Sequence, residues 1–61
     1  MTYGELKKLL LKNNCRKCRE GANHERWINE SNGKRFVIGR HDSQEVRTGT
    51  YHAILKEAGL K

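Results

Sequence analysis

The chain opens with an amphipathic helical pattern. Apolar side chains recur at i, i+3 and i+4 at Leu6, Leu9 and Leu10. This spacing predicts a first helix over residues 2–13, with one apolar face and its lysines off that face. Thr2 and Glu5 have the spacing of a capping box, in which each side chain bonds the backbone N–H of the other residue. Asn13-Asn14 predicts the helix end, because asparagine tolerates the left-handed conformation found there.

A second amphipathic pattern closes the chain. Apolar or small side chains recur at i, i+3, i+4 and i+7 at Tyr51, Ile54, Leu55 and Ala58. A second helix is therefore predicted over residues 48–58, with Thr48 or Thr50 as its cap. Gly59 suits the position just after the helix, and Leu60 can pack back on it, as in a Schellman ending.

Three short strands are predicted between the helices, at residues 15–20, 24–29 and 34–38. The first two are separated by Gly21-Ala22-Asn23. The last two are separated by a stretch that contains Asn32-Gly33, a strong hairpin signal because both residues accept positive φ.

The second predicted strand has two different faces. Glu25, Trp27 and Asn29 share one face, and the pattern alone does not decide whether that face is buried. In a chain so poor in apolar residues, Trp27 and Phe36 are interpreted as core residues rather than as exposed platforms for stacking bases.

The element order αβββα predicts an α+β fold in a single domain over residues 1–61. Consecutive strands joined by short turns make a three-stranded antiparallel sheet, and the two amphipathic helices cover one of its faces. The opposite face stays open to solvent or to a partner.

The net positive charge of the chain indicates which kind of partner it binds. The 61 residues carry a formal net charge of +6, with 13 Lys and Arg against 7 Asp and Glu, and the sequence pI is about 9.8. Such an excess favours a polyanionic partner, with nucleic acid first and an acidic protein second. The longest apolar run, Leu9-Leu10-Leu11, is far too short to span a membrane, and no signal-peptide apolar segment is present. A cytoplasmic protein with reduced thiols is therefore expected.

The two cysteines are candidate metal ligands. Cys15 and Cys18 have half of a zinc-site spacing, but structural zinc needs four ligands. His24, His41 and His52 do not form a His-x₃₋₅-His pair. No metal or other cofactor is expected, and both thiols are predicted to be small buried groups.

Several segments together resemble a known family. They are Tyr3-Gly4-Glu5-Leu6, the turn Gly21-Ala22-Asn23-His24, the hairpin, the pair Arg40-His41 and the closing stretch 48–60. In this combination, and over essentially the whole chain, they resemble the HicA toxins of bacterial and phage toxin–antitoxin systems. The resemblance implies a fold like that of double-stranded-RNA-binding domains, cleavage of messenger RNA (mRNA) independent of the ribosome, and neutralisation by a HicB antitoxin. It puts the catalytic histidine at His24.

Four positions depart from the family pattern. Gly39 stands where a proline usually precedes the Arg-His pair, and should make residues 39–41 less rigid. Asn14 stands where the first helix often ends in glycine, and Cys18 where an aliphatic residue is common. Arg26 is more polar than the usual strand residue.

His24 is the candidate catalytic residue. RNA carries its own nucleophile, the 2′-hydroxyl, and cleavage needs a base, a proton donor and a cation near the phosphate. Imidazole titrates near neutral pH and can act as general acid or base. We expect Lys17, Arg19 or Arg26 to supply the electrostatic stabilisation. From the residue pattern alone, a histidine at a strand edge is more often a surface residue, and it is the resemblance that favours catalysis.

Arg40 and His41 are predicted RNA contacts. His41 could be a second acid/base, but a phosphate contact or a loop-anchoring hydrogen bond is the favoured interpretation. His52 is interpreted as a solvated helix residue. Contacts from Lys and Arg to phosphate position RNA without reading its sequence.

The predicted function is the toxin of a type II toxin–antitoxin system: a metal-independent endoribonuclease, monomeric when free and hetero-oligomeric with its antitoxin. The alternative is a non-catalytic double-stranded-RNA-binding module, which explains the charge but does not need His24. A third hypothesis is a basic interaction domain for an acidic protein, which predicts no RNA binding.

Overall fold

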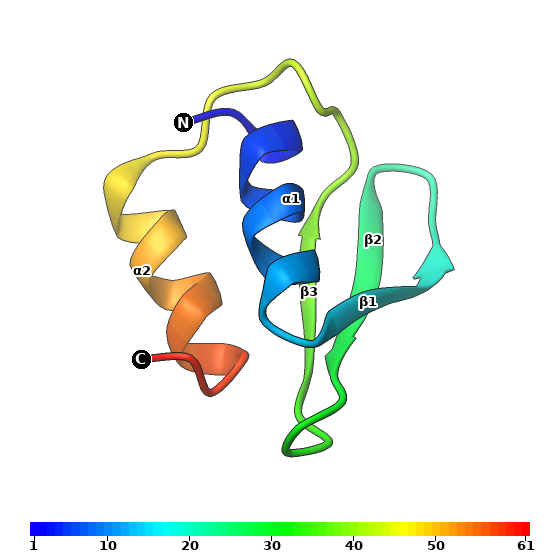
Figure 1. The fold of residues 1–61 in the computed structure, drawn as a ribbon. Coiled ribbons are helices and arrows are strands. Elements are labelled where there is room, and N and C mark those ends of the chain that lie inside the picture. The colour runs from blue at the N-terminus through cyan, green and yellow to red at the C-terminus, as the bar shows by residue number, and fades with distance from the viewer.

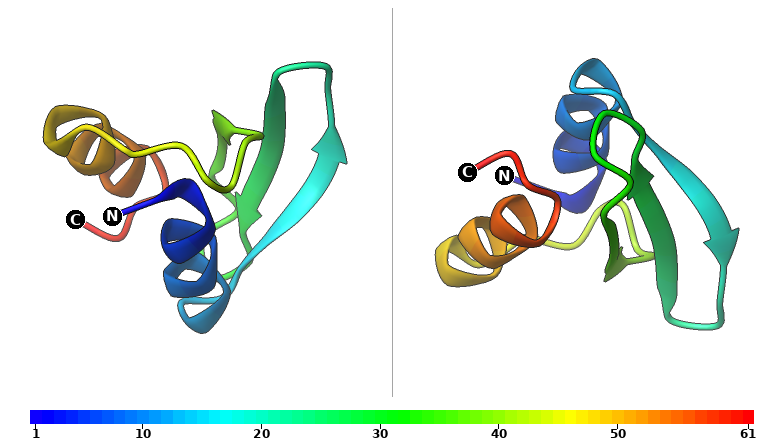
Figure 2. Two further views of the ribbon diagram at one scale, coloured as in Figure 1. Left: turned by 90° about the horizontal axis from the view of Figure 1, so that it is seen from above. Right: turned by 90° about the horizontal axis from the view of Figure 1, so that it is seen from below.

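Two helices lie on one side of a three-stranded sheet (Figures 1 and 2). The computed structural model describes residues 1–61. Its elements are α1 (Tyr3–Lys12), β1 (Cys15–Glu20), β2 (His24–Asn29), β3 (Arg35–Gly39) and α2 (Thr48–Glu57). The strands are antiparallel in the order β1-β2-β3. The predicted α+β class and the αβββα order are confirmed. No helix is long and apolar enough to cross a membrane.

The helix-facing side of the sheet holds the core. Trp27 and Phe36 are partners across β2 and β3, and each is 3% exposed, so their assignment to the core is confirmed. Glu25 and Asn29 lie on the same face as Trp27 and are also buried, which answers the question left open by the sequence. Because strand side chains alternate, His24 and Arg26 point to the other, uncovered face.

The predicted start and end of α1 are confirmed. The Thr2 hydroxyl accepts a hydrogen bond from the Glu5 backbone N–H at 3.2 Å, and the Glu5 carboxylate accepts one from the Thr2 backbone N–H at 2.9 Å. These bonds lower the pKa of Glu5 from its ordinary value. At the other end, Asn14 has the left-handed φ of 65°.

The end of α2 is a Schellman motif, as predicted, but the residue that caps its start differs from the prediction. Gly59 has a φ of +75°, and the Leu60 backbone N–H donates to the Leu55 carbonyl at 2.9 Å. The cap is Arg47, which makes no side-chain capping bond, so the assignment of Thr48 or Thr50 as the cap is wrong. The helix begins one residue earlier than that assignment requires, because the Arg47 carbonyl already accepts from the Tyr51 N–H.

The turn between β2 and β3 differs from a two-residue Asn-Gly turn. Asn29 and Lys34 close a four-residue loop through the bond from the Asn29 N–H to the Lys34 carbonyl, at 2.8 Å. Gly33 has positive φ and Asn32 does not, so the prediction is right for only one of the two residues. The Asn32 side chain instead accepts from the Lys34 N–H and donates to the Ala58 carbonyl, tying the loop to the end of α2.

The edge strand β1 contains a bulge. Its pairing with β2 shifts register between Lys17 and Arg19, so that Cys18 falls out of the ladder. The prediction of two buried thiols is confirmed for Cys15, which is 2% exposed, and is wrong for Cys18, which is exposed. Burial raises the pKa of the Cys15 thiol.

Candidate active site

A tight loop between β1 and β2 presents His24. The Gly21 backbone N–H donates to the His24 carbonyl at 2.7 Å, closing the loop 21–23. A Cβ at Gly21 would lie 3.0 Å from that carbonyl oxygen, so a larger residue would push the two backbones apart. Glycine therefore allows the close approach of the two backbones just before β2 begins.

The His24 side chain is exposed and makes no hydrogen bond within the chain. It is exposed at the first position of β2, and neither ring nitrogen takes part in a hydrogen bond or ion pair within the chain. Its backbone pairs with Gly39 at the end of β3. An imidazole in this state is free to exchange a proton with a bound molecule.

His24 lies at one end of a cationic depression on the uncovered face of the sheet, which we call the arginine groove. The groove is made of two adjoining hollows that share Arg19, Arg26 and Val37. Its lining residues are Cys18, Arg19, Arg26, Trp27, Arg35, Phe36, Val37, His24 and residues 21–23.

The arginines of this groove are not neutralised within the chain. Arg19 and Arg26 are direct partners across β1 and β2, both exposed. Neither they nor Arg35 forms an ion pair or a side-chain hydrogen bond within the chain. Like charges directly opposite each other destabilise a sheet. Their clustering is thus unfavourable for folding alone and favourable for binding an anion such as phosphate.

Lys17 does not join this group. It pairs with Trp27 across the strands, so it is on the helix-facing side, and its ammonium lies 3.6 Å from the Glu20 carboxylate. Because of the bulge at Cys18, Lys17 and Arg19 lie on opposite faces of the sheet. Of the three cations expected near His24, Arg19 and Arg26 therefore line the same groove as His24, and Lys17 lies apart.

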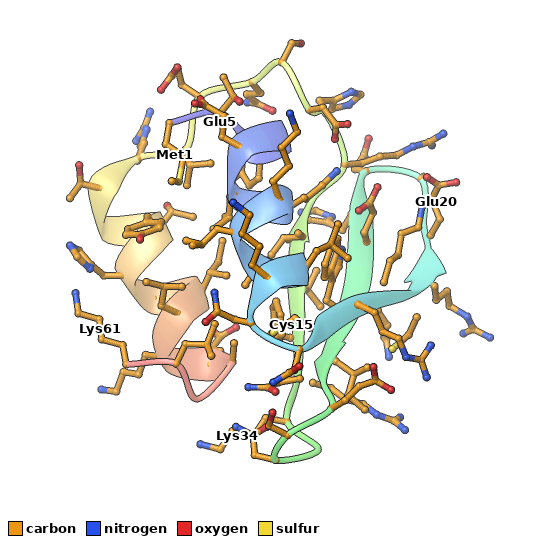
Figure 3. The ribbon with its side chains drawn as sticks, in the orientation of Figure 1. Met1, Glu5, Cys15, Glu20, Lys34 and Lys61 are labelled. Atoms are coloured by element: carbon orange, nitrogen blue, oxygen red, sulfur yellow. The ribbon has the colours of Figure 1, made fainter.

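Arg40 holds the loop that presents His24. Its guanidinium donates to the carbonyls of Gly21 at 3.4 Å and Ala22 at 3.2 Å, and its backbone N–H donates to the Asn23 carbonyl at 3.2 Å. The same guanidinium lies 3.8 Å from Glu20, which stands at the end of β1 where the loop begins (Figure 3). These contacts make Arg40 a positioning residue for His24, and RNA contact by Arg40 stays a prediction.

His41 lies beyond the arginine groove. Its side chain is exposed and lines neither hollow of that groove, and its carbonyl accepts from the Gln44 N–H at 3.2 Å. The structure brings no second imidazole beside His24. RNA contact by His41 also stays a prediction.

A buried ion pair underlies the site. The Lys7 ammonium is 3.1 Å from the Glu25 carboxylate, and their side chains are 11% and 6% exposed. Lys7 also donates to the Arg40 carbonyl at 3.1 Å and bonds the Asp42 carboxylate, while the Trp27 ring N–H donates to Glu25 at 3.1 Å. The network thus fixes the residue after His24 to both α1 and the segment 40–42.

The ion pairs in this network shift the pKa values of Lys7 and Asp42. Burial of the ammonium acts to lower the pKa of Lys7, but hydrogen bonds to Asp42 and Glu25 outweigh it, and the pKa is raised. The Lys7 ammonium in turn lowers the pKa of Asp42. Lys7 was expected off the apolar face, and it is nevertheless buried because two carboxylates compensate its charge.

Gly39 lies directly against the ring of Tyr3. A Cβ at this position would lie 3.0 Å from Cζ of Tyr3, so the Tyr3 ring packs directly against the glycine backbone. The expectation of a less rigid segment at 39–41 stays a prediction; the contacts of the Tyr3 ring, Arg40 and Lys7 act against it. In the sequence, Tyr3 is notable only as part of the segment Tyr3-Gly4-Glu5-Leu6, and no local pattern points to its long-range contact with Gly39.

The described residues include no group of three or more His, Cys, Asp or Glu side chains that could hold a metal ion. Cys15 and Cys18 are both free thiols, one buried and one exposed.

Comparison with known proteins gives one finding. A search of curated proteins finds no match, and a search of solved structures finds none either. The family model described as "HicA toxin of bacterial toxin-antitoxin" matches residues 3–60. Nearly the whole chain is covered, including the β1–β2 loop, His24 and α2. The chain therefore belongs to the HicA toxin family of bacterial toxin–antitoxin systems.

Proposed function

We propose that this toxin is a ribosome-independent endoribonuclease that cleaves mRNA, with His24 as general acid/base. The observation that carries the proposal is an exposed, unbonded imidazole at the end of a groove lined by unpaired arginines. Family membership supports a toxic activity, and the net charge of +6 supports a polyanionic substrate.

The proposed reaction uses the RNA as its own nucleophile. His24 accepts the proton of a 2′-hydroxyl, and the 2′-oxygen bonds to the adjacent phosphorus while the bond from phosphorus to the 5′-oxygen breaks. The leaving 5′-oxygen takes a proton from the imidazolium or from water, leaving a 2′,3′-cyclic phosphate and a 5′-hydroxyl. Arg19 and Arg26 stabilise the negative charge that builds on the phosphate oxygens.

We also propose that a HicB-type antitoxin inhibits the toxin by covering His24 and the arginine groove. Family membership supports an antitoxin partner, and a cationic groove favours an acidic surface on that partner. Binding there would compete directly with RNA.

Cleavage of labelled RNA in the presence of a chelator tests the proposal. Wild-type protein should cleave the RNA, and His24→Ala should lose about 10²–10⁴-fold in rate, the usual contribution of acid–base catalysis. His52→Ala is the matched control, an exposed histidine away from the groove, and should cleave normally. Binding without cleavage by the wild-type protein would favour a non-catalytic double-stranded-RNA-binding module, and no binding would favour a domain for an acidic protein. Undiminished cleavage by His24→Ala would remove that residue from the mechanism.

A further inference from the structure

A further hollow adjoins the arginine groove at His24 and Val37. It lies between the edge of β3 and the exposed side of α2, and we call it the β3–α2 niche. Its lining residues are Tyr3, His24, Val37, Ile38, Gly39, Thr50, Ala53, Ile54 and Glu57. His24 is thus shared by two depressions of different character.

The charges of the two depressions are opposite. The arginine groove carries unpaired guanidiniums, whereas the niche contains no lysine or arginine and one carboxylate, that of Glu57. A phosphate would be attracted to the first and repelled from the second. A nucleotide whose phosphate sits at His24 therefore has only its uncharged parts, base and ribose, to offer to the niche.

The walls of the niche suit a nucleobase. The Tyr3 ring packs on the bare backbone of Gly39, where any Cβ would lie 3.0 Å from the ring. The Tyr3 hydroxyl makes no hydrogen bond within the chain, and Ala53 and Ile54 supply apolar surface from α2. Aromatic and apolar walls with a few polar groups are typical of sites for small planar ligands.

Glu57 gives the niche a hydrogen-bond acceptor that can distinguish between bases. It is exposed, forms no ion pair or hydrogen bond within the chain, and is the last residue of α2. A carboxylate at the negative end of a helix is unfavourable for the helix, so folding does not account for its position. Carboxylates accept hydrogen bonds from base amino groups, as in their pairing with the N4 amine of cytosine.

We infer that the β3–α2 niche binds the base of a nucleotide next to the scissile phosphate, and that Glu57 favours a base that presents an amino group over uracil. This inference rests on the proposed ribonuclease function. Because the arginines contact phosphate and carry no sequence information, the niche is where base preference arises.

The test compares cleavage-site preference on one RNA pool that has all four bases at each position. The wild-type protein should disfavour uracil at one position flanking the cleaved bond. Glu57→Gln should weaken that discrimination about five- to tenfold, because a neutral amide oxygen accepts a weaker hydrogen bond than a carboxylate and the amide NH₂ can also donate to uracil. The preference is a ratio between RNAs cleaved in one pool, so it is read independently of the total amount of cleavage. Lys56→Gln, an exposed neighbour on α2 outside the niche, is the matched control and should keep the wild-type preference.

Each outcome decides between the two claims. Cleavage with the same base preference in wild-type and Glu57→Gln proteins would overturn the niche as a base site and leave the ribonuclease function standing. Loss of all cleavage in Glu57→Gln, with its circular dichroism unchanged, would also overturn it by placing Glu57 in the chemistry. Absence of cleavage by the wild-type protein would overturn both claims.

Discussion

Replacing Lys7 by methionine removes one partner of the buried ion pair beneath His24. The Glu25 carboxylate is 6% exposed and would lose the ammonium 3.1 Å away, keeping only the hydrogen bond from the Trp27 ring. Breaking a buried pair in this way costs about 3–5 kcal/mol of the free energy of unfolding. The bond from Lys7 to Asp42 adds less than the pair with Glu25, because the Asp42 side chain is 69% exposed.

That loss is large for a chain of this size. With 61 residues at about 0.05–0.15 kcal/mol each, the whole free energy of unfolding is roughly 3–9 kcal/mol. Lys7→Met should therefore lower the Tm by at least about 12 °C, taking about 3 kcal/mol at about 4 °C per kcal/mol. Thermal unfolding followed by circular dichroism measures the Tm, and urea unfolding followed by Trp27 fluorescence measures the free energy of unfolding.

Two further variants separate charge from packing. Lys7→Met combined with Glu25→Gln should recover most of the lost stability, because the buried negative charge is gone and the amide oxygen can still accept from Trp27. Lys8→Met, at an exposed lysine one position away, should change the free energy of unfolding by less than about 0.5 kcal/mol. The reasoning is refuted if Lys7→Met costs less than about 1 kcal/mol, or if the double variant is as unstable as the single one.

Three other predictions follow from particular contacts. In the native protein a thiol reagent should alkylate exposed Cys18 and spare Cys15, whose pKa is raised by burial, and mass spectrometry of the labelled chain reads this directly; labelling of both at equal rates would contradict the burial. Because Lys7 lowers the pKa of Asp42, the stability from their pairing is present above the carboxyl's ordinary pKa of 3.8 and is lost as the pH falls through the lower folded pKa, so Asp42→Asn should flatten the fall of Tm with acidification, and an unchanged slope would refute the pairing. Asn29→Ala should cost about 1–3 kcal/mol in urea unfolding, since the 1% exposed amide donates to the last turn of α2 at 2.7 Å; a cost below about 0.5 kcal/mol would show the bond to be unimportant.

Much of the architecture follows from local patterns. The apolar spacing predicts both helices, and the Thr2–Glu5 pair and Gly59 predict how α1 begins and α2 ends, because these signals act within a few residues. The strands follow from alternation and from the break at residues 21–23. The exposure of Cys18 could not be predicted, since a bulge depends on how β1 pairs with β2.

The candidate site was only partly predictable. His24 and its neighbours Arg19 and Arg26 come together as expected, because they belong to adjacent strands. The burial of Lys7 was missed, because one of its compensating carboxylates lies 35 residues further along the chain. The hydrogen bonds from Arg40 to the β1–β2 loop were also missed. Their acceptors are backbone carbonyls, which come near Arg40 only once the sheet has formed.

The measurement that bears most directly on the central claim is cleavage of one labelled RNA, with chelator present, by wild-type and His24→Ala proteins of equal Tm. The proposed mechanism predicts wild-type cleavage to a 2′,3′-cyclic phosphate and a 5′-hydroxyl, and a loss of about 10²–10⁴-fold in the variant. Equal rates for the two proteins, or no cleavage by either, would contradict it.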